Sequence, residues 1–167
     1  MGSSEDLSDR IIEFLPRLRR FARSLARNAQ DADDLVQITA ERALARSNQL
    51  RPDHSVQSWL FGILRNAWID ETRSRRRRES LLEPADLAEQ IGDPTGGSHP
   101  ELLCLQDALS RLPEDQRLAV ALVLVEGLSY KEAASIMSVP VGTLTSRLAR
   151  GREALQFMLS ETAGVLP

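Results

Sequence analysis

Hydrophobic residues recur at three- and four-residue spacing along most of this chain, which is the period of an amphipathic helix. The first periodic stretch runs from Leu7 to about Asn28. A second helix is predicted from Ala32 to Arg46 with Asp31 as its N-cap, and a third from about Ser55 into the arginine run at 75–78. No stretch shows the alternation of apolar and polar residues that is typical of a β-strand. The pattern therefore predicts an all-α protein.

The helical period is interrupted between residues 81 and 100, where proline and glycine cluster. The wider stretch Glu79–Ser110 contains no Lys or Arg, so this segment is acidic as well as rich in helix breakers. Such a composition is typical of an interdomain linker, with at most one weak helical turn near residues 85–90. We therefore expect two small helical domains, residues 1–80 and 101–167, joined by a flexible acidic linker at 81–100.

Residues 127–153 predict two short helices joined by a tight turn, as in a helix-turn-helix. Ser129 can cap the first helix while Glu132 reaches back to the cap amide, and Pro140 can open the second helix. One stripe of that second helix is apolar: Val141, Leu144, Leu148 and Leu155. The other side is polar: Thr143, Ser146, Arg147 and Arg150. An arginine in the major groove can bind guanine bidentately, so this side suits DNA reading better than the alternative, a hairpin whose solvated face would mix Glu and Lys.

The formal net charge of −3 does not by itself predict a nucleic-acid-binding protein, but the distribution of charge does. Arginines cluster near both ends of the chain: Arg17, Arg19, Arg20, Arg23 and Arg27, then Arg73 and residues 75–78, then Arg147, Arg150 and Arg152. Lys131 is the single lysine. Arginine favours planar, bidentate contacts with phosphate and guanine, and a GC-rich coding bias is the other explanation for its excess.

Catalytic and metal chemistry have no support in the sequence. Cys104 is the single cysteine, so neither a disulfide nor a CxxC metal site can form, and we expect it to be a buried small hydrophobe. His54 and His99 have no partner at metal-ligand spacing. We expect no enzyme activity and no cofactor. The amino terminus lacks a signal pattern and no apolar run approaches ~20 residues, so we also expect a cytoplasmic protein without membrane insertion.

A second nucleic-acid surface is predicted just ahead of the densest arginine run. Trp59, Phe61 and Trp68 are three of the seven aromatic residues in the chain, and single-stranded bases stack on aromatic rings. Asn66, Asp70 and Arg73 fall on one helix face, where Asn66 could read a base, Arg73 could hold a phosphate and Asp70 could orient that arginine. The alternative is that the tryptophans are core residues and the arginines form a solvated helix end.

Several sequence blocks, in this order, resemble the extracytoplasmic-function (ECF) subgroup of bacterial sigma-70 family RNA polymerase sigma factors. They are DADDLVQ at 31–37, WLFxIxRNxxxDxxR at 59–73, LPxxxR at 112–117, GLSYxEAA at 127–134 and VPVGTLxSRL at 139–148. The blocks cover most of the chain. The resemblance implies an alternative sigma factor that binds core RNA polymerase and directs promoter-specific initiation, in a stress or envelope response.

The resemblance also implies a division of labour between the two domains. The first would bind polymerase through one helix, with Asp34, Leu35, Gln37, Ile38 and Glu41. It would read the melted −10 element of the promoter with Trp59, Asn66, Asp70, Arg73, Arg76 and Arg77. The second would read the duplex −35 element with Thr143, Thr145, Ser146, Arg147, Ala149 and Arg150. Thr145 stands where many relatives have Lys or Arg, and Ile38 stands where relatives are often polar, so it is either an exposed interface residue or a local repacking.

The expected partners are core RNA polymerase, promoter DNA and an anti-sigma factor. The anti-sigma factor is expected because the chain shows no sensory domain or redox cysteine pair of its own. One rival is a sigma-like decoy that sequesters an anti-sigma factor, which should have lost its basic residues. Another rival is a stand-alone helix-turn-helix regulator, which leaves the aromatic and arginine-rich helix at 59–78 unexplained.

Overall fold

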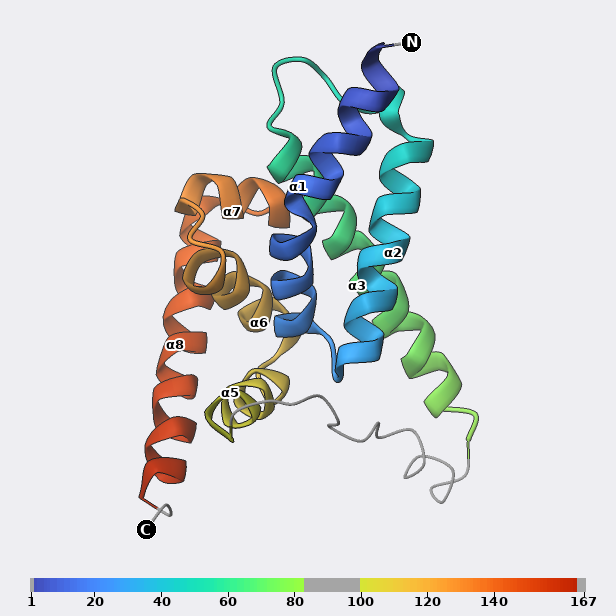
Figure 1. Cartoon of the computed structure of the whole chain (residues 1–167). Coiled ribbons are helices and arrows are strands. Elements are labelled where there is room, and N and C mark those ends of the chain that lie inside the picture. Colours follow the sequence, from blue (N-terminus) through green and yellow to red (C-terminus); the bar gives the residue numbers. More distant parts are fainter. Residues whose placement is uncertain (1, 83–99, 165–167) are drawn as a thin grey trace.

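The computed structural model describes residues 2–82 and 100–164, and within these ranges every regular element is a helix (Figure 1). The N-terminal bundle contains α1 (Gly2–Leu25), α2 (Ala29–Ala45) and α3 (Val56–Glu79), with a short 3₁₀ helix at Ser47–Gln49. The C-terminal bundle contains α5 (Pro100–Ser110), α6 (Glu114–Val120) with a π-helical continuation at Ala121–Val125, α7 (Tyr130–Met137) and α8 (Val141–Ala163). The predicted all-α class is confirmed. Most of the predicted linker, including its weak helical turn, lies outside these ranges.

The predicted cap of the second helix is wrong. Asn28, not Asp31, is the N-cap, because its backbone is extended and its side-chain oxygen accepts a hydrogen bond from the Asp31 amide at 2.8 Å. α2 therefore begins at Ala29, and Asp31 lies in its first turn, where a carboxylate is favoured by the helix dipole. α1 correspondingly ends at Leu25 rather than near Asn28.

The helix starts predicted near Ser55, Ser129 and Pro140 are confirmed, whereas α1 begins at Gly2, ahead of the predicted Leu7. Ser55 caps α3 through the Ser58 amide, and Ser129 and Glu132 form a reciprocal capping box at the start of α7. α7 ends at Met137 with Ser138 as its C-cap, whose backbone is left-handed with φ 57°, and α8 follows Pro140 directly. These local signals fix the helix-turn-helix geometry.

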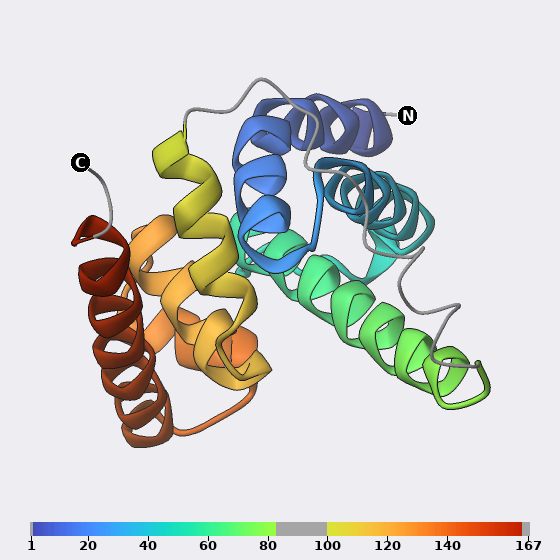
Figure 2. The ribbon, with the colours of Figure 1, turned by 90° about the horizontal axis from the view of Figure 1, so that it is seen from below.

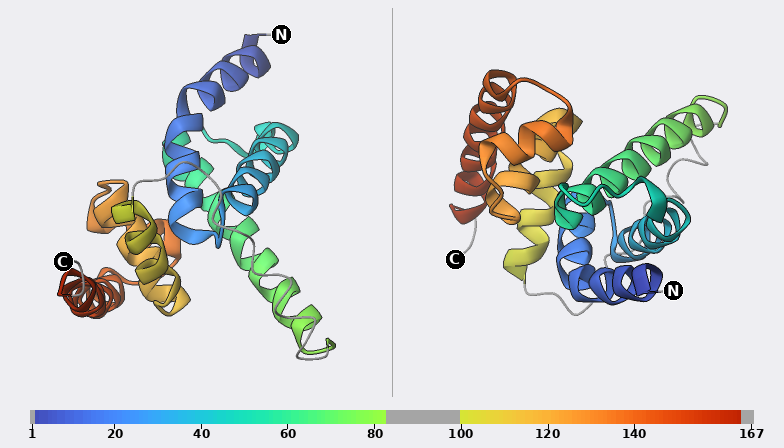
Figure 3. Two further views of the ribbon diagram at one scale, coloured as in Figure 1. Left: turned by 60° about the horizontal axis from the view of Figure 1, so that its bottom comes forward. Right: turned by 90° about the horizontal axis from the view of Figure 1, so that it is seen from above.

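The N-terminal bundle packs around aromatic and aliphatic side chains from all three of its helices. Phe21 of α1 and Phe61 of α3 meet edge to face with ring centroids 5.1 Å apart, and both are fully buried. α1 contains Pro16 and changes direction along its length, which the missing amide of a proline inside a helix explains (Figure 3). The C-terminal end of α3 projects beyond the other helices (Figure 2).

The C-terminal bundle places α6 and α7 against α8, and its core includes Leu144, Leu148 and Leu155 of the predicted apolar stripe. Val141, predicted in the same stripe, is 45% exposed because it lies in the first turn of α8. Cys104 is half-buried rather than buried, since it lies on the outer α5. The two bundles pack on each other, with α1 between α2 and the C-terminal helices and with α3 against α7 (Figures 1 and 2).

A close contact between α6 and α8 gives a stability prediction. A Cβ atom at Gly151 would lie 2.8 Å from Cγ2 of Val120, whereas one at Gly62 would meet nothing within 4 Å. We expect Gly151→Ala to destabilise the protein by about 1–3 kcal/mol through overpacking, and the control Gly62→Ala to stabilise it by up to about 1 kcal/mol. Urea unfolding monitored by circular dichroism measures both. Equal stability of the two variants would show that α6 and α8 are not held at this distance.

Candidate functional site

The aromatic residues predicted for base stacking differ in their accessibility. Phe61 and Trp68 are buried, with 1% and 4% exposure, and the Arg117 guanidinium lies over the Trp68 ring at 5.7 Å. For Trp68 the alternative interpretation, a core residue, is correct, and Phe61 is a core residue as well. Trp59 is half-buried and is the member of the set that keeps an accessible surface. The base-stacking prediction is therefore reduced to Trp59.

The polar face of α3 is exposed, but its internal pairing differs from the prediction. Asp70 does not orient Arg73; its carboxylate accepts a hydrogen bond from Arg42 of α2 at 3.1 Å. Asn66 is exposed, and its side-chain oxygen accepts a bond from Arg65 at 3.2 Å. Partial burial, together with the nearby charge of Arg73, lowers the pKa of Arg65. Asp70 and Asn66 therefore bond to residues outside the predicted triplet, one on α2 and one adjacent in α3.

The arginines at the end of α3 fall into two groups. Arg75 pairs with Asp31 at 3.1 Å, Arg78 pairs with Glu71 at 2.9 Å, and Arg76 pairs with Glu114 of the C-terminal bundle. Among residues 2–82 and 100–164, Arg73 and Arg77 form no ion pair, and both are exposed. With Asp70 and Arg76 they surround a shallow hollow on α3. Two of the three arginines at this hollow, Arg73 and Arg77, carry positive charge that no described carboxylate pairs with.

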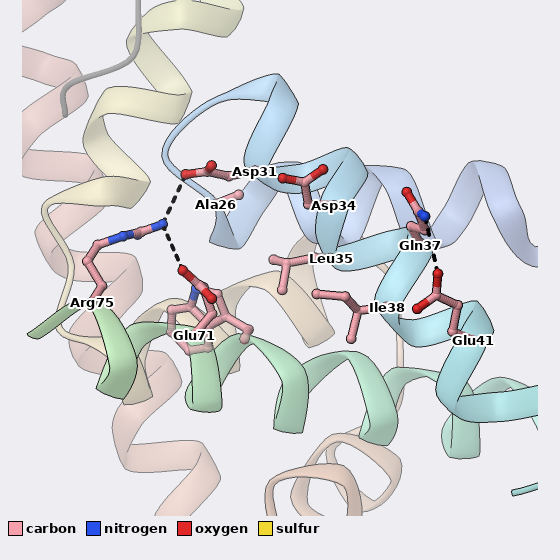
Figure 4. A pocket seen from close by; sticks show the side chains of 10 residues that line it. Ala26, Asp31, Asp34, Leu35, Gln37, Ile38, Glu41, Glu71 and Arg75 are labelled. Atoms are coloured by element: carbon pink, nitrogen blue, oxygen red, sulfur yellow. Dashed lines mark hydrogen bonds and ion pairs between the residues drawn. The ribbon is translucent and has the colours of Figure 1, made fainter. Parts of the chain in front are cut away.

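The five residues predicted to bind polymerase are brought together in one pocket of about 320 Å³ (Figure 4). Leu35, at 3% exposure, and the half-buried Ile38 form its apolar floor. Asp34, Gln37 and Glu41 are exposed at its rim, where Gln37 donates a hydrogen bond to Glu41 at 3.2 Å. Ile38 is half-buried in the pocket floor, so its partial exposure is compatible with both interpretations left open by the sequence.

Sequence reasoning missed the far wall of this pocket. Arg75 bridges Asp31 at 3.1 Å and Glu71 at 3.8 Å (Figure 4). Trp68 also lines the cavity. The spacing of Glu71 and Arg75, one helical turn apart, signalled that pair. No local sequence pattern indicated that the Glu71–Arg75 pair would face α2. The pocket combines an apolar floor with a predominantly acidic rim.

The polar face of α8 is accessible along its first turns. Thr145, Ser146, Ala149 and Arg150 are exposed and Thr143 is half-buried. The hydroxyls of Thr145 and Ser146 donate to the carbonyls of Val141 and Gly142, which leaves their oxygens available as acceptors. Arg150 forms no ion pair within the described part of the chain.

Arg147 is positioned by a carboxylate that the sequence did not reveal. Its Nε lies 3.3 Å from Oδ2 of Asp115, and Oδ1 of Asp115 accepts a hydrogen bond from the Gln116 amide at 2.9 Å. The carboxylate is therefore held by the first turn of α6 while it holds the arginine. This leaves the two terminal nitrogens of Arg147 as the pair that can face a guanine.

Another feature missed from the sequence is a charged cluster between the two bundles. Glu126 is buried, with no exposure of its side chain, and accepts hydrogen bonds from Arg17 at 3.2 Å and from Arg20 at 2.9 and 3.0 Å. Its backbone carbonyl accepts a further bond from Arg17 at 3.1 Å. The hydrogen bonds and charge of Glu126 raise the pKa of Arg20.

Arg117, from the predicted LPxxxR block, ties several chain segments together. It donates to the carbonyls of Ser110 and Leu112 at 2.6 and 3.0 Å, and to the carbonyl of Leu25 at the end of α1 at 3.1 Å. Burial lowers its pKa, and the Trp68 ring faces its guanidinium. Its role is structural.

Neither a metal site nor a membrane span is found among the residues that the structure places. Within 2–82 and 100–164, no group of His, Cys, Asp and Glu has the arrangement of a metal site. Over the same ranges, no helix combines the length and apolar character needed to span a bilayer.

Comparison with known proteins finds relatives for both bundles. A family model described as "Sigma-70, region 4" matches residues 102–155, and one described as "Sigma2 domain of PhyR" matches residues 11–65. The chain is 40% identical over 159 residues to the ECF RNA polymerase sigma factor EcfG of Rhodopseudomonas palustris (strain TIE-1), covering 95% of this chain and 88% of that protein. It is 36% identical over 143 residues to the ECF RNA polymerase sigma factor SigM of Mycobacterium tuberculosis (strain ATCC 25618 / H37Rv), covering 86% and 71%.

Solved structures with the same fold include two sigma-factor complexes. The sigma factor RpoE in complex with the anti-sigma factor NepR from Bartonella quintana matches with a TM-score of 0.79 at 33% identity, over 93% of this chain and 98% of that one. CnrH in complex with the cytosolic domain of CnrY matches with a TM-score of 0.73 at 25% identity, over 96% and 91%.

The contacts of Arg117 predict a large effect on stability. We expect Arg117→Met to lower the free energy of unfolding by about 2–3 kcal/mol, because three carbonyl acceptors lose their donor while the apolar stem is kept. The control Arg111→Met removes an exposed arginine that pairs with Asp107, and should change stability by less than about 0.5 kcal/mol. Chemical denaturation of both variants makes the comparison. A loss in Arg117→Met no larger than in the control would contradict the structural role.

Proposed function

The chain belongs to the ECF RNA polymerase sigma factors, and we propose that it binds core polymerase through α2 while α3 and α8 read separate promoter elements. Proteins of this family are transcription initiation factors rather than enzymes. The observation that carries the proposal is the gathering of all five predicted polymerase residues in one pocket, apart from both basic surfaces. In domain terms, residues 1–80 would be sigma region 2, residues 81–100 the linker and residues 101–167 sigma region 4.

The pocket on α2 suits a helical segment of polymerase that offers apolar side chains and basic residues. Leu35 and Ile38 provide apolar contact area, while Asp34 and Glu41 provide negative charge at the rim. Complementary charge steers the encounter and fixes orientation, and the buried floor supplies affinity. Leu35 would contribute through the pocket floor rather than as an exposed anchor.

The −10 element would be read by the exposed part of α3. Trp59 supplies an accessible aromatic surface, Asn66 supplies an amide for a base edge, and Arg73, Arg76 and Arg77 supply positive charge for the single-stranded backbone. Asp70 would act indirectly, because its pairing with Arg42 fixes the position of α3 relative to α2.

The −35 element would be read by the polar face of α8 in the major groove. Arg147, held through Nε by Asp115, and the unpaired Arg150 are the candidates for bidentate base contacts. Thr145, Ser146 and Thr143 offer hydroxyl oxygens, and Ala149 offers a small apolar surface. Thr145 carries no charge for a phosphate, so Arg150 would take a larger share of binding.

We also infer an anti-sigma partner. The RpoE structure, at 33% identity, contains the anti-sigma factor NepR, and the chain matches it over nearly its whole length. A role in a stress or envelope response stays a prediction. A cytoplasmic location also stays a prediction, and it would follow from binding to RNA polymerase. The decoy alternative is disfavoured, because Arg73, Arg77 and Arg150 remain exposed for DNA.

Run-off transcription with core polymerase tests the proposed function directly. We expect the purified protein to bind core polymerase and to produce transcripts from a subset of a promoter library, with no transcripts from core polymerase alone. The double variant Asp34→Ala/Glu41→Ala should weaken polymerase binding at least several-fold, whereas Glu5→Ala, an exposed acid on α1, should not. Binding to an anti-sigma factor without any transcript would instead identify a decoy.

Arg150 tests how the −35 element is read. We expect Arg150→Ala in the holoenzyme to cost about 1–3 kcal/mol at one −35 position and to relax sequence preference there. Arg152→Ala, in the same helix, serves as the control. Competition binding on −35 elements varied one position at a time measures the effect. Uniform weakening on every sequence would make Arg150 a phosphate contact.

A further inference from the structure

Asp115 is an exposed carboxylate beside the polar face of α8. It lies in the first turn of α6, and its Oδ2 atom is 3.3 Å from Nε of Arg147. Its side chain is 48% exposed, whereas that of Arg147 is 30% exposed. A carboxylate next to a surface that reads DNA repels the phosphate backbone, so its position here needs a physical reason.

Stability of the bundle does not provide that reason. Exposed ion pairs contribute little to folding, because solvent screens the charges and the side chains lose conformational freedom. The packing of α6 against α8 is also fixed without the pair (Figure 1). A Cβ atom at Gly151 would lie 2.8 Å from Cγ2 of Val120 and 3.3 Å from the carbonyl oxygen of Gln116, and Leu144 and Leu148 are buried.

This packing makes Asp115 a fixed support for Arg147. Gln116, the next residue in α6, lies against Gly151, one helical turn beyond Arg147 in α8. The Gln116 amide also donates a hydrogen bond to Oδ1 of Asp115 at 2.9 Å. One carboxylate oxygen is therefore bound to its own backbone while the other holds the arginine. The arginine can then be oriented by a group that does not move with it.

The contact with Asp115 decides which edge of the Arg147 guanidinium is available. The five N–H donors of a guanidinium lie in one plane, and the Nε edge is already taken by the carboxylate. The two terminal nitrogens match the O6 and N7 acceptors of guanine, whereas adenine presents an N6 donor in place of O6. An arginine without such a partner can turn to a phosphate instead. Arg150, on the same helix, pairs with no carboxylate that the structure describes.

We propose that Asp115 determines specificity without contacting DNA: it orients Arg147 towards a guanine of the −35 element, which raises base discrimination and lowers overall affinity for DNA. The inference rests on the proposed function of α8 and gives α6 a part in it. Asp115 is a positioning residue, because it acts through Arg147 and not on the DNA itself. Removal of this carboxylate should change affinity and discrimination in opposite directions.

Asp115→Asn and Asp115→Ala test the proposal in the full-length chain assembled with core polymerase. Competition binding on −35 elements varied one position at a time measures discrimination. The position that Arg147 reads is the one at which Arg147→Ala loses its preference, and Arg150→Ala identifies its own position in the same way. Glu153→Ala is the matched control, because it removes an exposed acid from α8. Circular dichroism checks that each variant is helical.

We expect both Asp115 variants to bind non-cognate −35 elements about two- to threefold more tightly than wild type, because a negative charge near phosphate is lost. Preference for guanine over adenine at the Arg147 position should fall about tenfold, and preference at the Arg150 position should stay unchanged. In an Arg147→Ala background, Asp115→Asn should cause no further loss of discrimination. Glu153→Ala should keep the full preference at both positions.

The Nε–H signal of Arg147 in ¹⁵N NMR spectra of the free protein reports the contact without DNA. We expect this signal to differ from that of a free arginine in wild type and to move towards the free value in Asp115→Asn. A wild-type signal at the free value overturns the proposal.

Binding results also separate this inference from the proposed function. Guanine preference that the folded Asp115 variants retain overturns the inference alone. Uniform weakening on every −35 element overturns it as well, since Asp115 would then be a structural residue. If wild-type holoenzyme shows no preference at any −35 position, the proposed function of α8 fails and the inference fails with it.

Discussion

A carboxylate taken out of water must be met by positive charge, and this constraint decides how the two halves of the molecule sit together. Glu126 can be buried only where Arg17 and Arg20 stand, so the end of α6 is placed against one side of α1. The position of α7 against α3 then follows, because the capping box at Ser129 starts α7 only three residues after Glu126. Apolar packing fills this contact, but the charges choose its register.

Arginine serves two separate purposes here, and burial distinguishes them. Arg17, Arg75 and Arg117 hold helices in place through carboxylates, carbonyls and aromatic rings. Arg73 and Arg150 are exposed and carry charge into solvent, where phosphate or guanine can be bound. The number of arginines therefore overstates the area of basic surface that is available to DNA, whereas the formal net charge of −3 understates it.

The features predictable from sequence are those fixed within one helical turn. Ser55 and the Ser129–Glu132 box are such cases, as is the common face of Asp34, Gln37 and Glu41. Which of Asn28 and Asp31 would cap α2 was not predictable, because both residue types can cap a helix. Asp31 instead pairs with Arg75, which lies 44 positions away in the sequence. The partners of Glu126 lie 106 and 109 positions distant, and no local pattern encodes them. Burial of Trp68 likewise depends on tertiary packing.

Gly151 gives α8 a second property besides close packing. The helix that carries Arg147 and Arg150 is seated on α6 at a point immediately beyond them, where Val120 leaves no room for a side chain. The position and rotation of the polar face of α8 are therefore fixed by the contact on its buried side, independently of which side chains occupy the polar face. The exposed residues Thr145, Ser146, Ala149 and Arg150 can change identity while the buried Leu144 and Leu148 keep the helix in position. If this face reads DNA as proposed, new promoter preferences can arise by exchange of single side chains on an unchanged helix.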